Sequence, residues 1–207
     1  MIEKQKVRKR GMSNSLKAAK SLLRKEIKKR VSVLTDAEKQ NQSKIVIEKL
    51  FRLEKFQTSN RVSVYLHMSD EVHTTSVVQQ LLATNKECFI PQYIGPVMKM
   101  VKLESLQDYT NLPETKWKIK QPADDDVRPD ALDTGGLDLI VMPGLGFSRQ
   151  CDRLGRGKGY YDTYLQKCEE AGYKPFTVAL AYNEQICDSI PTDTHDKQLD
   201  HVLFPDS

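Results

Sequence analysis

The chain has 207 residues, 39% hydrophobic and 29% charged, with a formal net charge of +4, and its length fits one domain with a sizeable core. No apolar run approaches the roughly 20 residues of a membrane span, and no apolar stretch typical of a secretory signal opens the chain, so we expect a cytoplasmic protein without membrane contact. The four cysteines are scattered, which argues against a zinc site or a disulfide framework: Cys88, Cys151, Cys168 and Cys187.

Positive charge is concentrated at the N-terminus. Residues 1–30 hold 12 Lys or Arg against two Glu, a local balance of +10 that leaves −6 for the rest of the chain. Residues 1–11 show no apolar periodicity, so we expect a disordered basic tail over residues 1–12 and a single domain over residues 13–207. A solvated charge run is the favoured interpretation of the tail, with nuclear import or an RNA contact as alternatives.

A helix is predicted from Ser13, which is a suitable N-cap. Apolar residues recur along it at steps of three and four: Leu16, Ala19, Leu22, Leu23 and Ile27. A second stripe on the same helix is basic: Lys17, Lys20, Arg24 and Lys28. By pattern alone, such a stripe is more often a solvated face than a binding surface.

The next segments alternate between helices and strands. A capping box from Thr35 to Glu38 predicts a second helix, and the apolar pattern predicts another over residues 74–84. Strands are predicted over residues 61–67, 88–91, 98–103, 137–142 and 176–181, with a hairpin across Gly95-Pro96. This order predicts an α/β fold with mostly parallel strands.

Two polar loops flank the later strands. Asp124, Asp125 and Asp126 lie in the first and have the composition of a metal cluster, but adjacent acids cannot all face one ion without an unusual turn. A solvated loop is therefore favoured there. Residues 188–196 form the second loop, and their local sequence singles out no site.

A glycine-rich basic stretch follows the apolar residues 137–142. Residues 155–162 read Gly-Arg-Gly-Lys-Gly-Tyr-Tyr-Asp. The alternating glycines let the backbone approach an anion and adopt positive φ, while Arg156 and Lys158 supply charge. If residues 160–170 form a helix, its free N–H groups would face the same anion, and Asp162 in its first turn could hold a magnesium ion beside bound phosphates.

Two familiar glycine motifs do not match this stretch. A P-loop has a glycine five residues before its Gly-Lys pair and Ser or Thr after it, but Asp152 and Gly159 occupy those positions. A dinucleotide fingerprint has a glycine three residues after Gly157, where Tyr160 stands.

The stretch over residues 153–162, together with the preceding Met-Pro-Gly-Leu-Gly-Phe of residues 142–147, closely resembles the 5-formyltetrahydrofolate cyclo-ligases, also called methenyltetrahydrofolate synthetases. The resemblance extends over nearly the whole chain. It implies ATP- and magnesium-dependent cyclisation of 5-formyltetrahydrofolate to 5,10-methenyltetrahydrofolate by phosphorylation of the formyl oxygen, releasing ADP and phosphate. It also implies a doubly wound α/β domain of the sugar-phosphate isomerase-like type. We expect a monomer that binds a small-molecule folate, with or without a polyglutamate tail, and no nucleic acid.

The resemblance assigns roles on the ATP side. Lys20 and Arg24, four residues apart on one helix face, would hold ATP phosphates. The nucleotide would also contact Arg153, Leu154, Gly155, Arg156, Gly157, Lys158, Gly159, Tyr160 and Tyr161. Arg153, Arg156 and Lys158 would be catalytic because they neutralise the transferring phosphoryl group. Asp162 and Asp196 would hold Mg²⁺.

Further roles concern the folate. The resemblance implies that Leu66 and Glu71 contact the folate. Leu66 lies near the end of the predicted strand 61–67 and Glu71 in the loop after it, where open α/β sheets bind ligands, and a carboxylate suits the N–H donors of a pterin edge. Arg156, Gly157, Lys158, Gly159 and Tyr160 would also contact the substrate. Trp117 fits either a core plug or a folate-stacking wall. Of Tyr160 and Tyr161, we expect one to face the substrate and the other the core.

Two rival functions stay open at this level. A phosphosugar isomerase on a similar fold would need no ATP. A nucleic-acid-binding protein using residues 1–30 would bind with a steep salt dependence, but it would leave the basic stretch 153–158 unexplained.

Overall fold

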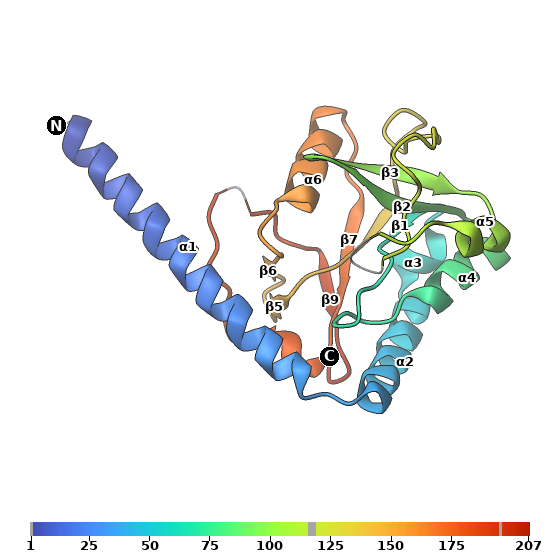
Figure 1. The fold of residues 1–207 in the computed structure, drawn as a ribbon, viewed down its shortest axis with the longest axis horizontal. Helices are drawn as coiled ribbons and strands as arrows, with labels where there is room; N and C mark the ends of the chain where they lie inside the picture. The colour runs from blue at the N-terminus through green and yellow to red at the C-terminus, as the bar shows by residue number, and fades with distance from the viewer. Residues whose placement is uncertain (1, 116–118, 195) are drawn as a thin grey trace.

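A computed structural model gives the fold of residues 2–115, 119–194 and 196–207 (Figure 1). Its centre is a six-stranded sheet in the order β3-β2-β1-β4-β7-β9. The strands are β1 Arg61–Val64, β2 Glu87–Ile94, β3 Val97–Leu103, β4 Leu139–Met142, β7 Phe176–Leu180 and β9 His201–Leu203. All neighbours are parallel except β2 and β3, which form an antiparallel hairpin. The predicted α/β fold with mostly parallel strands is confirmed, and so is the hairpin across Gly95-Pro96.

Helices cover both faces of the sheet. They are α1 Ile2–Ser32, α2 Asp36–Arg52, α3 Glu54–Thr58, α4 Thr75–Ala83, α5 Leu106–Asn111 and α6 Tyr160–Glu170. Successive strand side chains point to opposite faces, so Val141 of β4 packs in a cluster with α1, α2 and α4, whereas Met142 packs in a second cluster with α6. The sheet is therefore the middle of three layers.

A second, three-stranded sheet was not predicted. It consists of β5 Gly146–Ser148, β6 Arg153–Leu154 and β8 Ile186–Cys187, in the order β6-β5-β8. The buried Gln185, in the 3-10 helix Asn183–Gln185, donates to the carbonyls of Gly144 and Leu145 at 2.9 and 3.2 Å. These bonds tie the small sheet to the end of β4.

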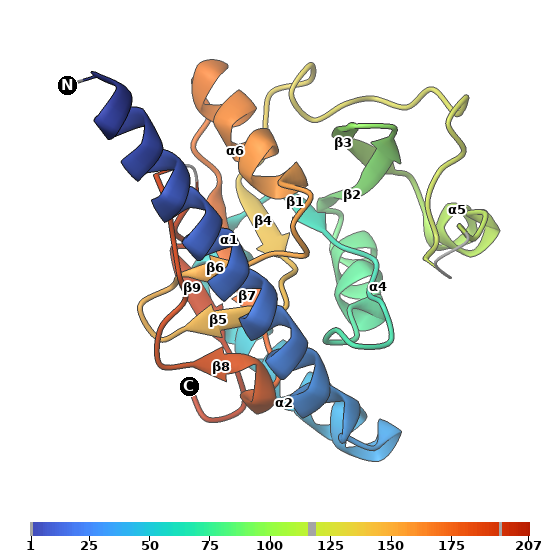
Figure 2. The same cartoon turned by 60° about the vertical axis from the view of Figure 1, so that its left-hand side comes forward.

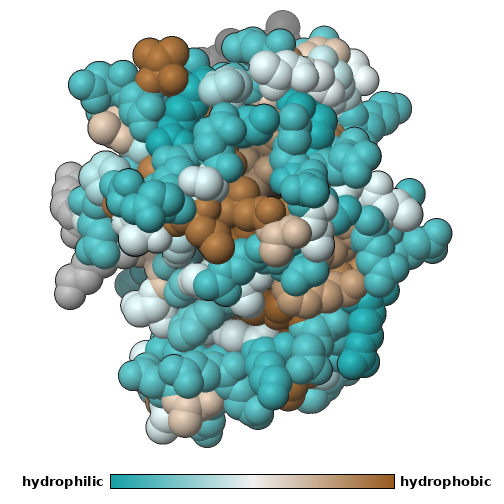
Figure 3. Space-filling view, turned by 90° about the vertical axis from the view of Figure 1, so that its right-hand side faces the viewer, coloured by the Kyte–Doolittle hydropathy of each residue, from teal (hydrophilic) through white to brown (hydrophobic). Residues whose placement is uncertain are grey.

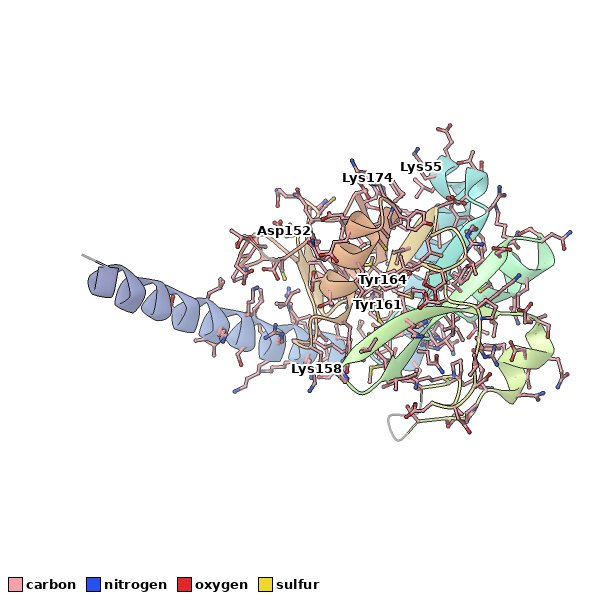
Figure 4. The ribbon with its side chains drawn as sticks, turned by 90° about the horizontal axis from the view of Figure 1, so that it is seen from above. Lys55, Asp152, Lys158, Tyr161, Tyr164 and Lys174 are labelled. Atoms are coloured by element: carbon pink, nitrogen blue, oxygen red, sulfur yellow. The ribbon has the colours of Figure 1, made fainter. Side chains whose placement is uncertain are left out.

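The helix predicted from Ser13 begins earlier in the structure. α1 begins at Ile2, so residues 2–12 continue the helix and Ser13 is not its N-cap. The segment contains no proline and is rich in Lys, Arg, Gln and Glu, which are good helix formers. Extending a helix that is already nucleated costs little free energy. The N-terminal part of α1 projects beyond the other elements (Figures 1 and 4). The disordered basic tail over residues 1–12 and the boundary of the single domain at residue 13 stay predictions.

Other differences are smaller. β1 ends at Val64, so residues 65–67 belong to the following loop. The capping box at Thr35 is present, with its side chain accepting from Glu38 N at 3.2 Å and Glu38 Oε2 accepting from Thr35 N at 2.7 Å. The helix predicted over residues 160–170 is confirmed as α6.

Five large apolar side chains are exposed in the described part of the chain. Among the described residues they are Leu22, Val33, Val97, Leu106 and Val127. The face drawn in Figure 3 is mostly hydrophilic, with apolar groups visible between polar ones. Single exposed apolar residues are normal for a folded domain and do not define a docking surface. No helix within the described ranges has the length and apolar character needed to cross a membrane.

Candidate active site

The predicted site residues converge at the carboxyl ends of β1 and β4. The loop after β1 brings Asp70 and Glu71, and the segment after β4 brings the glycine turn that leads into α6. α1 lies alongside β5 and β6 (Figure 2), and its Arg24 Nε donates to Gly155 O at 2.9 Å. Residues separated by about 130 positions therefore meet at the edge where parallel α/β sheets bind ligands.

The glycine turn has the predicted positive φ at two of its three glycines. Gly157 and Gly159 adopt left-handed φ of +98° and +71°, which favours glycine at both positions. Gly159 is the N-cap of α6 and no side chain caps this end, so the first N–H groups of the helix stay available to an anion. Gly155 is not left-handed, but a Cβ there would lie 3.0 Å from Arg153 Nη1. Its small size makes room for that arginine.

Three cations surround this turn. The Arg24 guanidinium lies against Gly157, because a Cβ placed there would be 3.5 Å from Arg24 Cζ. Lys20 Nζ lies 2.5 Å from Asp196 Oδ2 and 3.2 Å from Asp193 Oδ2. Burial lowers the Lys20 pKa, but the hydrogen bonds to the two carboxylates outweigh it, so the pKa is raised and the amine stays charged. Lys158 is exposed on the turn and has no ion pair with any described residue (Figure 4).

Arg153 has a different environment from the one that the resemblance implies. It lies in β6 and is only 8% exposed. Its Nη2 contacts Asp162 Oδ2 at 2.8 Å and its Nη1 donates to Pro143 O at 3.2 Å, while Nε has no hydrogen-bond partner in the described protein. The guanidinium therefore orients the Asp162 carboxylate through this ion pair. Direct contact of Arg153 with phosphate stays a prediction. Leu154 beside it is buried in the core.

The two predicted magnesium ligands lie near each other. Asp162 Oδ1 accepts from the backbone N of Lys197, the residue after Asp196, at 3.4 Å. No group of three or more His, Cys, Asp or Glu that could hold a metal occurs within the described residues. Two carboxylates nevertheless fit Mg²⁺, which is commonly held by one or two carboxylates together with substrate phosphates and water.

The loop after β1 supplies the acidic side of the site. Arg156 Nη2 lies 2.6 Å from Asp70 Oδ1 and 2.9 Å from Glu71 Oε1, and Arg156 Nε lies 3.2 Å from Glu71 Oε1. Burial raises the pKa of Glu71, although the positive charge of Arg156 opposes that shift. The Tyr182 hydroxyl donates to Glu71 O at 2.6 Å and so fixes the backbone of the loop.

The other predicted substrate contacts differ in burial. Leu66 is buried, and Trp117 lies outside the described residues. Tyr160 is half-buried and its hydroxyl donates to Gly95 O at 2.8 Å, whereas Tyr161 is buried in the cluster under α6 (Figure 4). Tyr161 is thus the core-facing tyrosine.

Sequence reasoning missed three residues beside the site: Asp70, Asp193 and Tyr182. Asp70 could have been found as a second carboxylate adjacent to Glu71. Tyr182 and Asp193 reach the site from distant segments, so no local pattern marks them.

If Lys20 and Arg24 hold ATP phosphates as the resemblance implies, replacing both with alanine is expected to raise KM for ATP by at least about tenfold and KM for the folate much less, because two charge-assisted contacts would be lost. Initial rates with each substrate varied in turn measure this. The matched control is Lys17→Ala with Lys28→Ala, which removes two exposed charges from the same helix. A larger effect on the folate KM would place α1 on the folate side.

Known proteins are similar to this chain in sequence and in fold. Residues 16–205 match the pattern of the 5-formyltetrahydrofolate cyclo-ligase family. A mouse 5-formyltetrahydrofolate cyclo-ligase is 46% identical over 93% of this chain and 97% of its own length, and a probable cyclo-ligase of Caenorhabditis elegans is 37% identical over 92% and 95%. The structure resembles that of Aquifex aeolicus 5,10-methenyltetrahydrofolate synthetase with a TM-score of 0.72 and 30% identity, covering 89% of this chain and 88% of the other.

Proposed function

Because this chain belongs to the 5-formyltetrahydrofolate cyclo-ligase family and converts 5-formyltetrahydrofolate to 5,10-methenyltetrahydrofolate, we propose that its site has two halves with separate tasks. The cationic half, formed by α1 and the glycine turn, holds ATP. The acidic half, formed by the loop after β1, holds the folate ring. The observation that supports a single site best is the bond between Arg156 of the glycine turn and Glu71 of the acidic loop, because it places the two halves side by side.

The ATP half uses backbone and side-chain donors together. Membership of the family implies ATP use. The uncapped start of α6, Arg24 and Lys158 converge on one turn, which suits a polyphosphate. Asp162, with Asp196 beside it, would hold Mg²⁺, which when bound neutralises charge on the phosphate oxygens. Lys20 forms an ion pair with Asp196 in this structure. When Mg²⁺ binds, Lys20 would either share the Asp196 carboxylate with the ion or turn to a phosphate.

The formyl group on N5 is an amide, so its oxygen is a poor leaving group and its carbon a poor electrophile. Transfer of the γ-phosphoryl group to the formyl oxygen changes both properties. N10 then attacks the formyl carbon, loses its proton, and phosphate leaves with the former formyl oxygen. Lys158 and Arg156 would stabilise charge on the transferring group, and catalysis would consist mainly of positioning and electrostatics.

This route predicts where the formyl oxygen goes. With ¹⁸O in the formyl group, the label is expected to appear in inorganic phosphate, as measured by mass spectrometry, while methenyl absorbance follows product formation. A parallel reaction with unlabelled substrate in ¹⁸O-water controls for hydrolysis. Label appearing in water would show that ATP hydrolysis is only coupled to ring closure, and the phosphoryl-transfer roles of Arg156 and Lys158 would be withdrawn.

The proposal also includes the fold type, the oligomeric state, the cellular compartment and the form of the folate. The sheet would be a doubly wound domain of the sugar-phosphate isomerase-like type, and the protein would act as a cytoplasmic monomer on folates with or without a polyglutamate tail. It would need no nucleic acid. ADP formation that depends on formylated folate would exclude the phosphosugar isomerase alternative.

A further inference from the structure

Arg156 joins the two halves of the site through two carboxylates. Its Nη2 contacts Asp70 and Glu71 at once, and its Nε adds a second bond to Glu71 Oε1. Asp70 and Glu71 come from the loop after β1, whereas Arg156 is 85 positions away from Glu71 in the chain. The guanidinium that would serve the phosphoryl group is therefore held by the carboxylate that would serve the folate, if the proposed function is correct.

Arg156 and the folate ring compete for the hydrogen-bond acceptor positions of Glu71. A carboxylate offers about four acceptor positions on its two oxygens. Glu71 Oε1 accepts twice from Arg156, and Oε2 accepts from Met68 N at 3.0 Å, so about one position remains. The amino-amide edge of a pterin presents two parallel N–H donors that need one position on each oxygen. Binding this edge therefore removes at least one Arg156 hydrogen bond.

Asp70 determines what Arg156 does after that exchange. Its side chain is 33% exposed, against 7% for Glu71, and it holds Nη2 at 2.6 Å on the outer side of the pair. Nη1 makes no hydrogen bond to any residue in the described part of the chain, so it can reach an incoming oxygen while Nη2 keeps Asp70. The bond to Asp70 thus keeps the guanidinium close to the glycine turn when Glu71 lets go.

We propose that Asp70 is a positioning residue, and that partner exchange at Arg156 couples folate binding to nucleotide binding. With no folate present, Glu71 competes with phosphate for Arg156 and weakens nucleotide binding. The folate takes over Glu71 and makes the guanidinium available. By thermodynamic reciprocity, the nucleotide strengthens folate binding by the same factor.

Calorimetry with two unreactive ligands tests this coupling. The nucleotide is a non-hydrolysable ATP analogue with Mg²⁺, and the folate is 5-methyltetrahydrofolate, which has the pterin edge but no formyl oxygen to phosphorylate. For the wild-type chain we expect the nucleotide Kd to fall by about tenfold when the folate is saturating, within the usual range of coupling between sites.

Three variants identify the residues responsible. Arg156→Ala is expected to abolish the gain. Asp70→Asn is expected to reduce the gain, because the guanidinium is no longer held near the glycine turn when Glu71 releases it. Asp126→Asn is the matched control: it breaks an Asp–Arg pair of 2.8 Å whose arginine, Arg128, belongs to the loop before β4, and it should keep the wild-type ratio.

The outcomes separate the inference from the function on which it rests. If both ligands bind the wild-type chain independently, the coupling is wrong and the proposed function stands. If Asp70→Asn keeps the wild-type ratio, Asp70 does not position Arg156. Failure of the wild-type chain to bind either ligand would overturn the proposed function itself.

Discussion

Replacing Lys158 with alanine is expected to lower kcat by about two to three orders of magnitude and to leave the fold intact. Lys158 is exposed at the tip of the glycine turn and pairs with no described residue, so its removal deletes no packing and leaves no buried group unpaired. Its charge would act on the transferring phosphoryl group, where a single well-placed donor typically contributes a factor of 10² to 10³.

Steady-state rates and thermal unfolding of the same preparations measure the two halves of this prediction. Lys174→Ala is the control, because Lys174 is also exposed but follows the C-terminal end of α6. We expect both variants to unfold within about 0.5 kcal/mol of the wild-type chain, and only Lys158→Ala to lose activity. A near-normal kcat for Lys158→Ala would remove this residue from the mechanism.

The sequence was most informative where a local pattern carries its own physical cause. The capping box at Thr35 satisfies free N–H groups within four residues, and the hairpin turn needs only a residue such as Gly95 that tolerates positive φ. The glycine turn belongs to the same class, because Gly157 and Gly159 have the left-handed backbone that their spacing indicated. All three features were predicted at nearly the correct positions.

The missed features depend on partners distant in the chain. β5 and β8 each have only two or three residues and exist because Phe147 pairs with Ile186, 39 positions later. Asp70 gains its role only when Arg156 arrives from the segment after β4. Burial is equally non-local. The resemblance implied one role for Arg153, Arg156 and Lys158, although the structure buries Arg153 and exposes Lys158.

Replacing Arg153 with alanine is therefore expected to destabilise the chain, in contrast to the loss of Lys158. The Arg153 side chain is 5% exposed and forms an ion pair with Asp162, whose side chain is 25% exposed. Removing one partner of a buried pair typically costs 3–5 kcal/mol. Because Asp162 is partly solvated, we expect the lower end, about 3 kcal/mol, in chemical denaturation.

A double variant distinguishes the ion pair from other losses. Arg153→Met with Asp162→Leu removes both charges and keeps much of the volume, so it should recover part of the stability lost in Arg153→Ala, because no unpaired charge remains. The double variant is expected to stay inactive, since Asp162 would hold Mg²⁺. If Arg153→Ala instead keeps the wild-type stability and loses only activity, the guanidinium acts on phosphate, as the resemblance implies, and its pairing with Asp162 contributes little to the fold.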